Sequence, residues 1–502
     1  MMRSRYWIRL IGLCVLIALS VGLLNGCQDG QPQSQPDVLV DGAIYKITSS
    51  LSSRVMEASY FGMMEGNYVQ SMDWEGALNQ VWKAQKQADG TWAFQNMSTL
   101  RYLTVKRAST SKGTQLCVEQ REEGAVAQAF AVENAQTGYD EYRISAVVSG
   151  LYLELNDNGK ANETKIVQNE KSDAIGQLWY FDMVDDGSTR LPYTWTLEGA
   201  PRGNSCPEVT RYKDKYYAYV MAHGIGIKQS DDMIHWQQIG TAMPMPSNSS
   251  TELSFAWQEE EIPGGNFVAP GVYKIGEQYC LYYAVTTEGS QESFIGMLTN
   301  TTLDPAEEGY DWVDKGIVLR SHYADPYNCI DPNVFIDVDG QPWLVWGSWW
   351  EGIFMRKIDP ATGYLDETDP QLHHLASYGP GEKGVEAPYL IYRDGWYYLF
   401  VAQGNMDQGS YLFKVARSKN IFGPYQDSDG ELAMEGHYEL VTSSQQGVRS
   451  PGHASVFQDV DGTYYLVSEY FGDDNYCKLY IGTLEWTEDG WPYSALLNGI
   501  FD

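Results

Sequence analysis

Short runs in which apolar and polar residues alternate recur from about residue 40 to the end of the chain. Alternation with a period of two is the pattern of a half-buried β-strand. Between about 190 and 502 no long amphipathic helical stretch interrupts these runs. The chain after residue 40 is therefore predicted to be all-β.

The segment 40–185 contains three copies of a Gln-x-aromatic motif. The aromatic positions 82, 130 and 179 are 48 and 49 residues apart, and similar short strands precede each copy. The copies are Gln80-Val81-Trp82, Gln128-Ala129-Phe130 and Gln177-Leu178-Trp179. A period of this length indicates three equivalent β-units, which can bury their apolar faces only by closing around an axis. The segment is predicted to form one domain of three repeats.

The segment 190–502 contains five turns, each followed by an aromatic-rich strand. The turns begin near Tyr212, Ile275, Asp339, Asp394 and Asp461, about 55 to 67 residues apart. The Asp-Gly copies are typical of hairpin turns that require positive φ. Each spacing is long enough for a four-stranded blade with functional loops. The segment is predicted to be a five-bladed β-propeller in which the innermost strand of each blade precedes its hairpin.

The first 27 residues have the pattern of a targeting segment. Arg3, Arg5 and Arg9 precede the apolar run Leu10–Leu24, which ends in Leu24-Asn25-Gly26-Cys27. The run is short for a membrane-spanning helix and typical of a signal peptide. Its end resembles the lipobox of bacterial lipoproteins, which implies that Cys27 is lipidated and anchors the protein at the cell surface. A polar linker is expected over 28–39.

Composition and charge narrow the possible ligands. The 502 residues carry a net charge of −32, which excludes nucleic acid and disfavours polyanionic substrates. The 16 Trp and 36 Tyr suit β-strands and stacking against sugar rings. The seven Cys include no Cys-x-x-Cys pair, which argues against a zinc site or a disulfide framework. A neutral ligand and a monomer are expected.

Two acidic residues occupy equivalent places before the third and fourth hairpins. They are Asp331 in Asp331-Pro332-Asn333-Val334 and Glu386 in Glu386-Ala387-Pro388-Tyr389. A nearby proline removes a backbone donor at the start of a strand, which frees the acid from regular pairing. Because inner strands of a propeller converge on a central funnel, we expect the two carboxyl groups to meet there.

Both repeat systems resemble known families. The Gln-x-aromatic repeats resemble the ricin-type β-trefoil, a family 13 carbohydrate-binding module, which implies sugar binding and a structural role for most motif aromatics. The segments 328–332, 385–388, 347–352 and 452–455 resemble glycoside hydrolase family 43, and within it the α-1,5-L-arabinanases. This second resemblance implies an inverting mechanism with Glu386 as general acid and Asp331 as the group that raises its pKa and orients it. It also implies that His453 lies near the propeller axis, where a calcium ion is held through a histidine and waters.

The third acid of that family, the general base, is absent from its expected position. The resemblance places it in the first blade, where the chain reads Ser205-Cys206-Pro207-Glu208-Val209. A thiol is a poor substitute for a carboxylate at neutral pH. Three explanations stay open: another base such as Glu208 or the acidic segment 259–261 acts, the propeller only binds sugar, or Cys206 itself acts. The second blade departs as well, because Val268-Ala269-Pro270-Gly271 lacks the family's Trp and Asp.

The sequence thus predicts a lipid-anchored glycosidase that hydrolyses arabinan-type plant polysaccharide. The alternatives are an exo-acting enzyme on arabinoxylan or galactan and a catalytically impaired surface glycan-binding protein. Trp349 and Trp350 are the favoured stacking platforms for substrate, and Trp236 and Trp257 are further candidates. Calcium at the axis is expected, with no organic cofactor.

Overall fold

The computed structural model describes most of the chain after residue 38. The described residues are 39–59, 66–74, 77–122, 124–185, 198–199, 205–222, 224–244, 253–379, 384–406, 410–444, 448–472 and 476–494. The predicted leader, Cys27 and the linker up to residue 38 lie outside them. Across these described ranges, no helix combines the length and the apolar character needed to cross a membrane.

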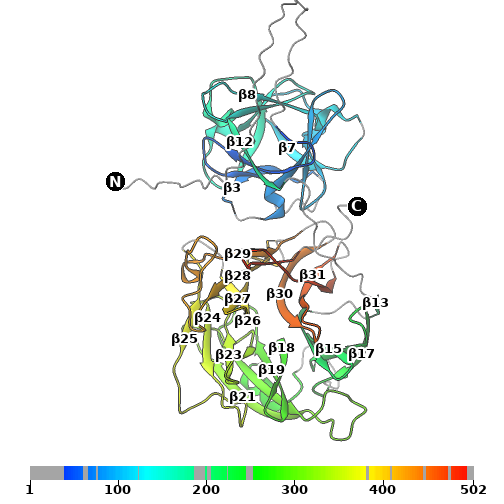
Figure 1. The fold of residues 1–502 in the computed structure, drawn as a ribbon, viewed down its shortest axis with the longest axis vertical. Helices are drawn as coiled ribbons and strands as arrows, with labels where there is room; N and C mark the ends of the chain where they lie inside the picture. Colours follow the sequence, from blue (N-terminus) through cyan, green and yellow to red (C-terminus); the bar gives the residue numbers. More distant parts are fainter. Residues whose placement is uncertain are drawn as a thin grey trace, which may run out of the picture. The chain divides into compact units, whose positions relative to one another are not determined.

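Residues 44–185 form a twelve-stranded arrangement of paired strands (Figure 1). Its strands are β1 (Ile44–Ser49), β2 (Val55–Ala58), β3 (Val69–Met72), β4 (Val81–Lys86), β5 (Trp92–Asn96), β6 (Tyr102–Val105), β7 (Thr114–Glu119), β8 (Phe130–Asn134), β9 (Tyr142–Ala146), β10 (Tyr152–Leu155), β11 (Thr164–Asn169) and β12 (Trp179–Asp185). The first and last strands pair antiparallel along their length, which closes the domain.

The threefold repeat is visible in single-turn 3₁₀ helices that end at the motif glutamines. These helices are η2 (Leu78–Gln80), η4 (Val126–Gln128) and η6 (Ile175–Gln177), and η3 (Lys106–Ala108) and η5 (Asn156–Asn158) are further turns. Each motif glutamine donates from Nε2 to a backbone carbonyl seven or eight residues earlier. The motif aromatics Trp82, Phe130 and Trp179 are fully buried. Their predicted structural role is confirmed.

The remaining described residues form five separate antiparallel sheets that follow one another in sequence (Figure 1). The first sheet contains β14 (Ser205–Tyr212), β15 (Lys215–Met221), β16 (Gly226–Ser230) and β17 (His235–Thr241), and β13 (Glu198–Gly199) pairs with β17 in parallel. The second sheet contains β18 (Asn266–Ile275), β19 (Gln278–Thr286), β20 (Ser293–Asn300) and β21 (Val313–Ser321), and the third contains β22 (Asn333–Ile336), β23 (Pro342–Trp346), β24 (Ile353–Lys357) and β25 (His373–Ala376). The fourth sheet contains β26 (Val385–Arg393), β27 (Trp396–Gln403), β28 (Leu412–Ser418) and β29 (Glu439–Thr442), and the fifth contains β30 (Arg449–Gln458), β31 (Tyr464–Phe471) and β32 (Cys477–Thr483). The short elements α1 (Ala256–Glu261), η7 (Ala433–Glu435), β33 (Glu485–Trp486) and β34 (Pro492–Tyr493) lie outside these sheets.

The five sheets close into a ring through their first strands. β14 contacts β18, β18 contacts β22, β22 contacts β26, β26 contacts β30, and β30 contacts β14 again. Each predicted hairpin joins the first and second strand of one sheet, as between Tyr212 and Lys215 or between Arg393 and Trp396. The prediction of a five-bladed propeller with the first strand innermost is confirmed.

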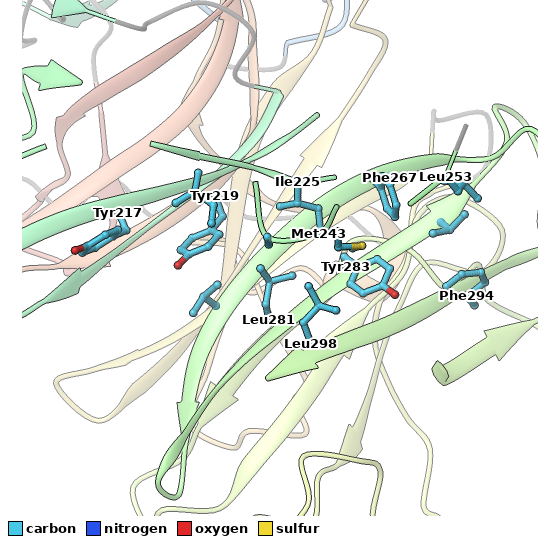
Figure 2. Packing of buried hydrophobic residues seen from close by; sticks show 14 of the residues in the cluster. Tyr217, Tyr219, Ile225, Met243, Leu253, Phe267, Leu281, Tyr283, Phe294 and Leu298 are labelled. Carbon is cyan, nitrogen blue, oxygen red and sulfur yellow. The ribbon is translucent and has the colours of Figure 1, made fainter. Parts of the chain in front are cut away.

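Aromatic and aliphatic side chains fill the space between neighbouring blades. Figure 2 shows this packing for the first two blades, where Tyr219 and Ile225 face Leu281 and Tyr283. Their burial stabilises the ring, because no single sheet can cover both of its faces. Trp236 is 1% exposed and donates to the carbonyl of Met233, so its candidacy as a stacking platform was wrong.

Two further candidates lie in α1, the short helix before the second blade. The acidic segment 259–261, a candidate base, forms the end of α1. Trp257 is half-buried, packs against Phe294 and donates from Nε1 to Asp314 Oδ2 at 2.8 Å, so it serves the packing of the blade.

Candidate active site

In each blade a corner residue with a left-handed backbone lies in the innermost strand or just before it, and in the fifth blade Ser450 is left-handed as well. The φ angles are 50° at Cys206, 47° at Ala269, 56° at Asp331, 50° at Ala387 and 43° at His453. Such values are uncommon for residues other than glycine. In blades one, two, four and five, the pairing of the innermost strand shifts register at this corner, as in a β-bulge. All five corners line one narrow channel at the centre of the ring.

Asp331 is the acid that stands on such a corner. It is 5% exposed, and its Oδ2 accepts a hydrogen bond of 3.0 Å from the backbone N–H of Ala387. Its Oδ1 lies 3.9 Å from Nε2 of His453. Burial raises the pKa of Asp331 to about 7, against a lowering by the Ala387 N–H. Asp331 of the third blade is therefore hydrogen-bonded to Ala387 of the fourth blade, the residue that follows Glu386.

Glu386 is half-buried and receives three hydrogen bonds. Oε2 accepts from Ser348 Oγ at 2.8 Å and from Trp349 Nε1 at 3.1 Å, and Oε1 accepts from Tyr411 Oη at 2.6 Å. A Cβ on Gly452 would overlap the Tyr411 ring, so this glycine makes room for the contact. Burial and then the charge of Asp331 raise the pKa of Glu386, while the Tyr411 and Ser348 donors lower it. A raised pKa is what a general acid requires near neutral pH.

A cavity of about 590 Å³ opens beside Glu386. Its lining includes the predicted platforms Trp349 and Trp350, together with Asn328 and the segment 286–290 of the second blade. Trp349 is 41% exposed, and both tryptophans adopt left-handed backbone angles, 56° and 46°. Strain of this kind persists where the surrounding structure enforces it, often at ligand sites. The cavity places a flat aromatic surface within reach of a carboxyl group with a raised pKa.

Cys206 occupies the corner of the first blade that corresponds to Asp331. It is 8% exposed. Burial, followed by the charges of Glu469 and Asp331, raises the pKa of the Cys206 thiol well above its ordinary value. The thiol is therefore protonated at neutral pH, and it cannot accept a proton from water.

Glu208 lies further along the channel than the other predicted site residues. Its Oε2 accepts a hydrogen bond of 2.6 Å from Tyr273 Oη. It also lines a second cavity of about 400 Å³, whose lining includes neither Asp331 nor Glu386. A Cβ on Gly271 would overlap the Glu208 carboxylate, so the departure from the family pattern at Gly271 makes room for it. Burial raises the pKa of Glu208 to about 8.

Sequence reasoning missed one acid of the site, Glu469 in β31. Its side chain is fully buried, and Oε2 accepts a hydrogen bond of 2.7 Å from the backbone N–H of Cys206. Oε1 has no hydrogen-bond partner among the described residues. The available signal was a glutamate in the middle of the apolar strand Tyr464–Phe471.

His453 lies where the resemblance placed it, at the central channel. Burial lowers its pKa, against the charges of Glu469 and Glu386, so the ring is neutral and its lone pair is available to a cation. The nearby carboxyl groups make the potential there negative. Within the described ranges, His453 belongs to no group of three potential ligand side chains. Among the described residues the imidazole of His453 could offer one nitrogen ligand to a cation, and water would have to supply the others.

Comparisons with known proteins agree with this geometry. The model of the glycosyl hydrolases family 43 matches residues 201–492, and that of the ricin-type β-trefoil lectin domain-like family matches 37–119 and 126–209. An extracellular exo-α-(1→5)-L-arabinofuranosidase of Cellvibrio japonicus is 31% identical over 301 residues, which is 57% of this chain and 84% of the relative. An extracellular endo-α-(1→5)-L-arabinanase of Bacillus subtilis is 34% identical over 275 residues, 54% of this chain and 79% of the relative.

Solved structures give the same result. The structure of a Cellvibrio cellulosa α-L-arabinanase with arabinohexaose aligns with a TM-score of 0.54 and 30% identity, over 59% of this chain and 96% of that one. The family model covers more than half of the chain, and its match spans all five blades. The chain belongs to the glycosyl hydrolases family 43.

Proposed function

We propose that this protein hydrolyses arabinan-type plant polysaccharide at the cell surface, with Glu386 as general acid. The observation that supports the proposal is Glu386 itself, a carboxyl group with a raised pKa that three hydrogen-bond donors hold at the rim of a tryptophan-lined cavity. The relatives named for α-(1→5)-linked arabinose support the choice of substrate.

In this mechanism Glu386 protonates the glycosidic oxygen as the bond to the anomeric carbon breaks. Burial and then the charge of Asp331 raise the pKa of Glu386, and Asp331 also holds the adjoining peptide through Ala387. Water attacks from the opposite face of the sugar, which inverts the anomeric configuration. Trp349 and Trp350 stack against the sugars beside the cleaved bond.

A surface glycan-binding protein is the second candidate, because Cys206 replaces the expected base. Loss of base assistance would slow hydrolysis by about 10²- to 10⁴-fold. In that case Glu386 and Asp331 would serve only as hydrogen-bonding groups, and the protein would hold polysaccharide without cutting it.

The test compares the purified protein with its Glu386→Gln variant on linear arabinan, arabinoxylan and β-1,3-galactan. Reducing sugar released from arabinan by the wild type and lost in the variant supports the proposal. If more sugar is released from arabinoxylan or from β-1,3-galactan, that polymer and not arabinan is the substrate. No release from any polymer, together with retained binding in calorimetry, would establish the glycan-binding alternative.

The proposal also assigns roles to the trefoil and to the N-terminal segment. A weak sugar-binding module linked to the propeller in the same chain raises the effective concentration of polymer. Lipidation at Cys27 would hold both domains at the cell surface. Detergent phase partitioning of cell extracts tests the anchor: the wild type enters the detergent phase, and Cys27→Ser stays in the aqueous phase if Cys27 carries the lipid.

Calcium at the axis is also proposed, with His453 as its protein ligand and waters completing the shell. When bound, the ion would add positive charge near the carboxyl groups. Metal analysis of the purified protein before and after chelation tests this assignment, with His453→Ala as the variant that should lose the ion.

A further inference from the structure

The innermost strands of the propeller have two ends, and a separate cavity lies at each end. Every innermost strand runs from its corner towards its hairpin, as β22 does up to Ile336, which pairs with Pro342. The 590 Å³ cavity takes its lining from the corner end, including the segment 286–290 at the end of β19 and the segment 348–350 after β23. The 400 Å³ cavity takes its lining from the hairpin end, including Ile336 and Tyr392. The proposed mechanism uses only the first cavity.

The central channel separates the two cavities for anything larger than water. It shares Glu208, Tyr273 and Tyr389 with the 400 Å³ cavity, and among the described residues it shares no lining residue with the 590 Å³ cavity. The channel encloses about 30 Å³, which is about the volume of one water molecule in the liquid. A ligand at the hairpin end would therefore enter from that face and would not compete with a substrate beside Glu386.

Several polar groups at the hairpin end are left without a protein partner. Glu208 is 8% exposed, and its Oε2 accepts a hydrogen bond of 2.6 Å from Tyr273 Oη. Its Oε1 makes no hydrogen bond to any described residue and is not sealed from solvent. The hydroxyl groups of Tyr389 and Thr210, which line the same cavity, likewise lack a hydrogen-bond partner in the described part of the chain. A ligand that carries hydroxyl groups can pair with all three in place of water.

Aromatic side chains form much of the wall around these polar groups. Phe335, Tyr392, Phe457 and Tyr464 line the cavity, and Tyr392 is 40% exposed. An aromatic ring offers a flat apolar surface to the C–H face of a sugar. The volume of about 400 Å³ lies in the range of about 300–1,000 Å³ that is typical of small-molecule sites. This combination fits a ligand that has both hydroxyl groups and an apolar face.

The charges at the cavity favour a neutral ligand. Burial raises the pKa of Glu208 to about 8, so its carboxyl group is protonated at neutral pH and can both donate and accept a hydrogen bond. Lys274 lines the same cavity, and its ammonium group repels a cation. The net charge of −32 repels an anion. A neutral sugar satisfies all three conditions.

We propose that the hairpin end of the propeller channel is a second carbohydrate site, which holds a neutral mono- or disaccharide between Glu208 and the aromatic walls. Hydroxyl groups of the sugar bond to Glu208 Oε1, Tyr389 Oη and the Thr210 hydroxyl. The site goes beyond the proposed function, because it requires no hydrolysis. It would give the propeller a hold on a short sugar while the 590 Å³ cavity is occupied by another chain.

The experiment titrates the full chain with L-arabinose and follows hydrogen exchange by mass spectrometry. Arabinose has no glycosidic bond to cleave, and the protected peptides locate the site. We expect protection of peptides that cover 208–212 and 389–393, with a dissociation constant on the order of millimolar. Tyr389→Phe and Thr210→Val should each raise this constant by about two- to tenfold, because each removes one hydrogen bond to the sugar. Neither hydroxyl has a described protein partner, so both variants should fold.

Two controls separate this site from the others. Trp350→Ala, which alters the 590 Å³ cavity, should leave the protection of 208–212 and 389–393 unchanged. A parallel titration with ethylammonium tests for a cation site. Protection by ethylammonium but not by arabinose, lost in Glu208→Gln, would overturn the proposal and assign the cavity to a cation.

Two further results would overturn the inference. One is the absence of protection at the hairpin end at arabinose concentrations well above the millimolar range. The other is an equal dissociation constant in the wild type and in both hydroxyl variants. Neither result depends on hydrolysis: a protein that releases no sugar from arabinan can still bind arabinose here, and an active enzyme can fail to bind it.

Discussion

Asp331 accepts a hydrogen bond of 3.0 Å from the backbone N–H of Ala387, the residue that follows Glu386. Through this bond the third blade holds the backbone of the fourth blade next to Glu386. Burial is the largest cause of the raised pKa of Glu386, and the charge of Asp331 adds to it. The same carboxylate thus helps to set both the position and the proton affinity of Glu386.

Replacing Asp331 by Asn is expected to separate these two effects. The amide oxygen can still accept from Ala387, but the charge is gone, so the pKa of Glu386 falls. Because a general acid must be protonated, the alkaline limb of the kcat/KM profile should move to lower pH. A pH profile on a soluble arabino-oligosaccharide measures this, and an alkaline limb that stays in place contradicts the assignment.

Tyr411→Phe should move the same limb in the opposite direction. The hydroxyl donates to Oε1 of Glu386 at 2.6 Å and favours its ionised form. Without it the pKa of Glu386 rises further, because the ionised carboxylate loses a hydrogen-bond donor. Opposite shifts in Tyr411→Phe and Asp331→Asn, read from parallel pH profiles, would identify Glu386 as the titrating acid. Shifts of the same sign would not.

Trp350→Ala should weaken substrate binding with little change in kcat. Trp350 lines the cavity beside Glu386 without contacting its carboxylate through a hydrogen bond in the described structure. Loss of one stacked aromatic costs about 0.5–1.5 kcal/mol, so KM should rise by about two- to tenfold. Trp74→Ala is the control, because this exposed tryptophan belongs to the trefoil. Equal effects of both variants on short oligosaccharides would refute the assignment of Trp350.

Glu208 should make the protein less stable as the pH rises. Its pKa is about 8 in the folded protein and near 4.5 when unfolded. A raised carboxyl pKa contributes stability that is complete below pH 4.5 and is lost between 4.5 and 8, at roughly 1.4 kcal/mol per pH unit. The wild-type Tm should therefore fall more steeply between pH 5 and 8 than that of Glu208→Gln. Parallel slopes in calorimetry would show that Glu208 ionises freely in the fold.

The sequence predicted what local patterns encode. The hairpin turns and the Gln-x-aromatic spacing located both repeat systems, and the Asp-Pro and Ala-Pro corners located Asp331 and Glu386. These features can be recognised in the sequence because each is formed by a few consecutive residues. The left-handed corners explain why a proline follows: the inner strand bulges there, and its regular pairing is interrupted.

The remaining parts of the site depend on contacts between distant segments. Glu469 and Cys206 are 263 residues apart and meet only through closure of the ring. Glu208 lies two residues after Cys206, and regular alternation would place both side chains on one strand face, but the register shift between Ser205 and Glu208 breaks this alternation. Neither a ring closure nor a bulge can be read from alternating hydrophobicity alone.

Protonation of the leaving group by Glu386 can be tested through the dependence of the rate on the leaving group. Wild type and Glu386→Gln are compared on aryl α-1,5-arabino-oligosaccharides whose phenols range from weakly to strongly acidic. A general acid is needed least when the leaving phenol is most acidic. Glu386→Gln should lose activity on arabinan and on glycosides of weakly acidic phenols but approach the wild type on a dinitrophenyl glycoside. A uniform loss of activity across the whole series would contradict it.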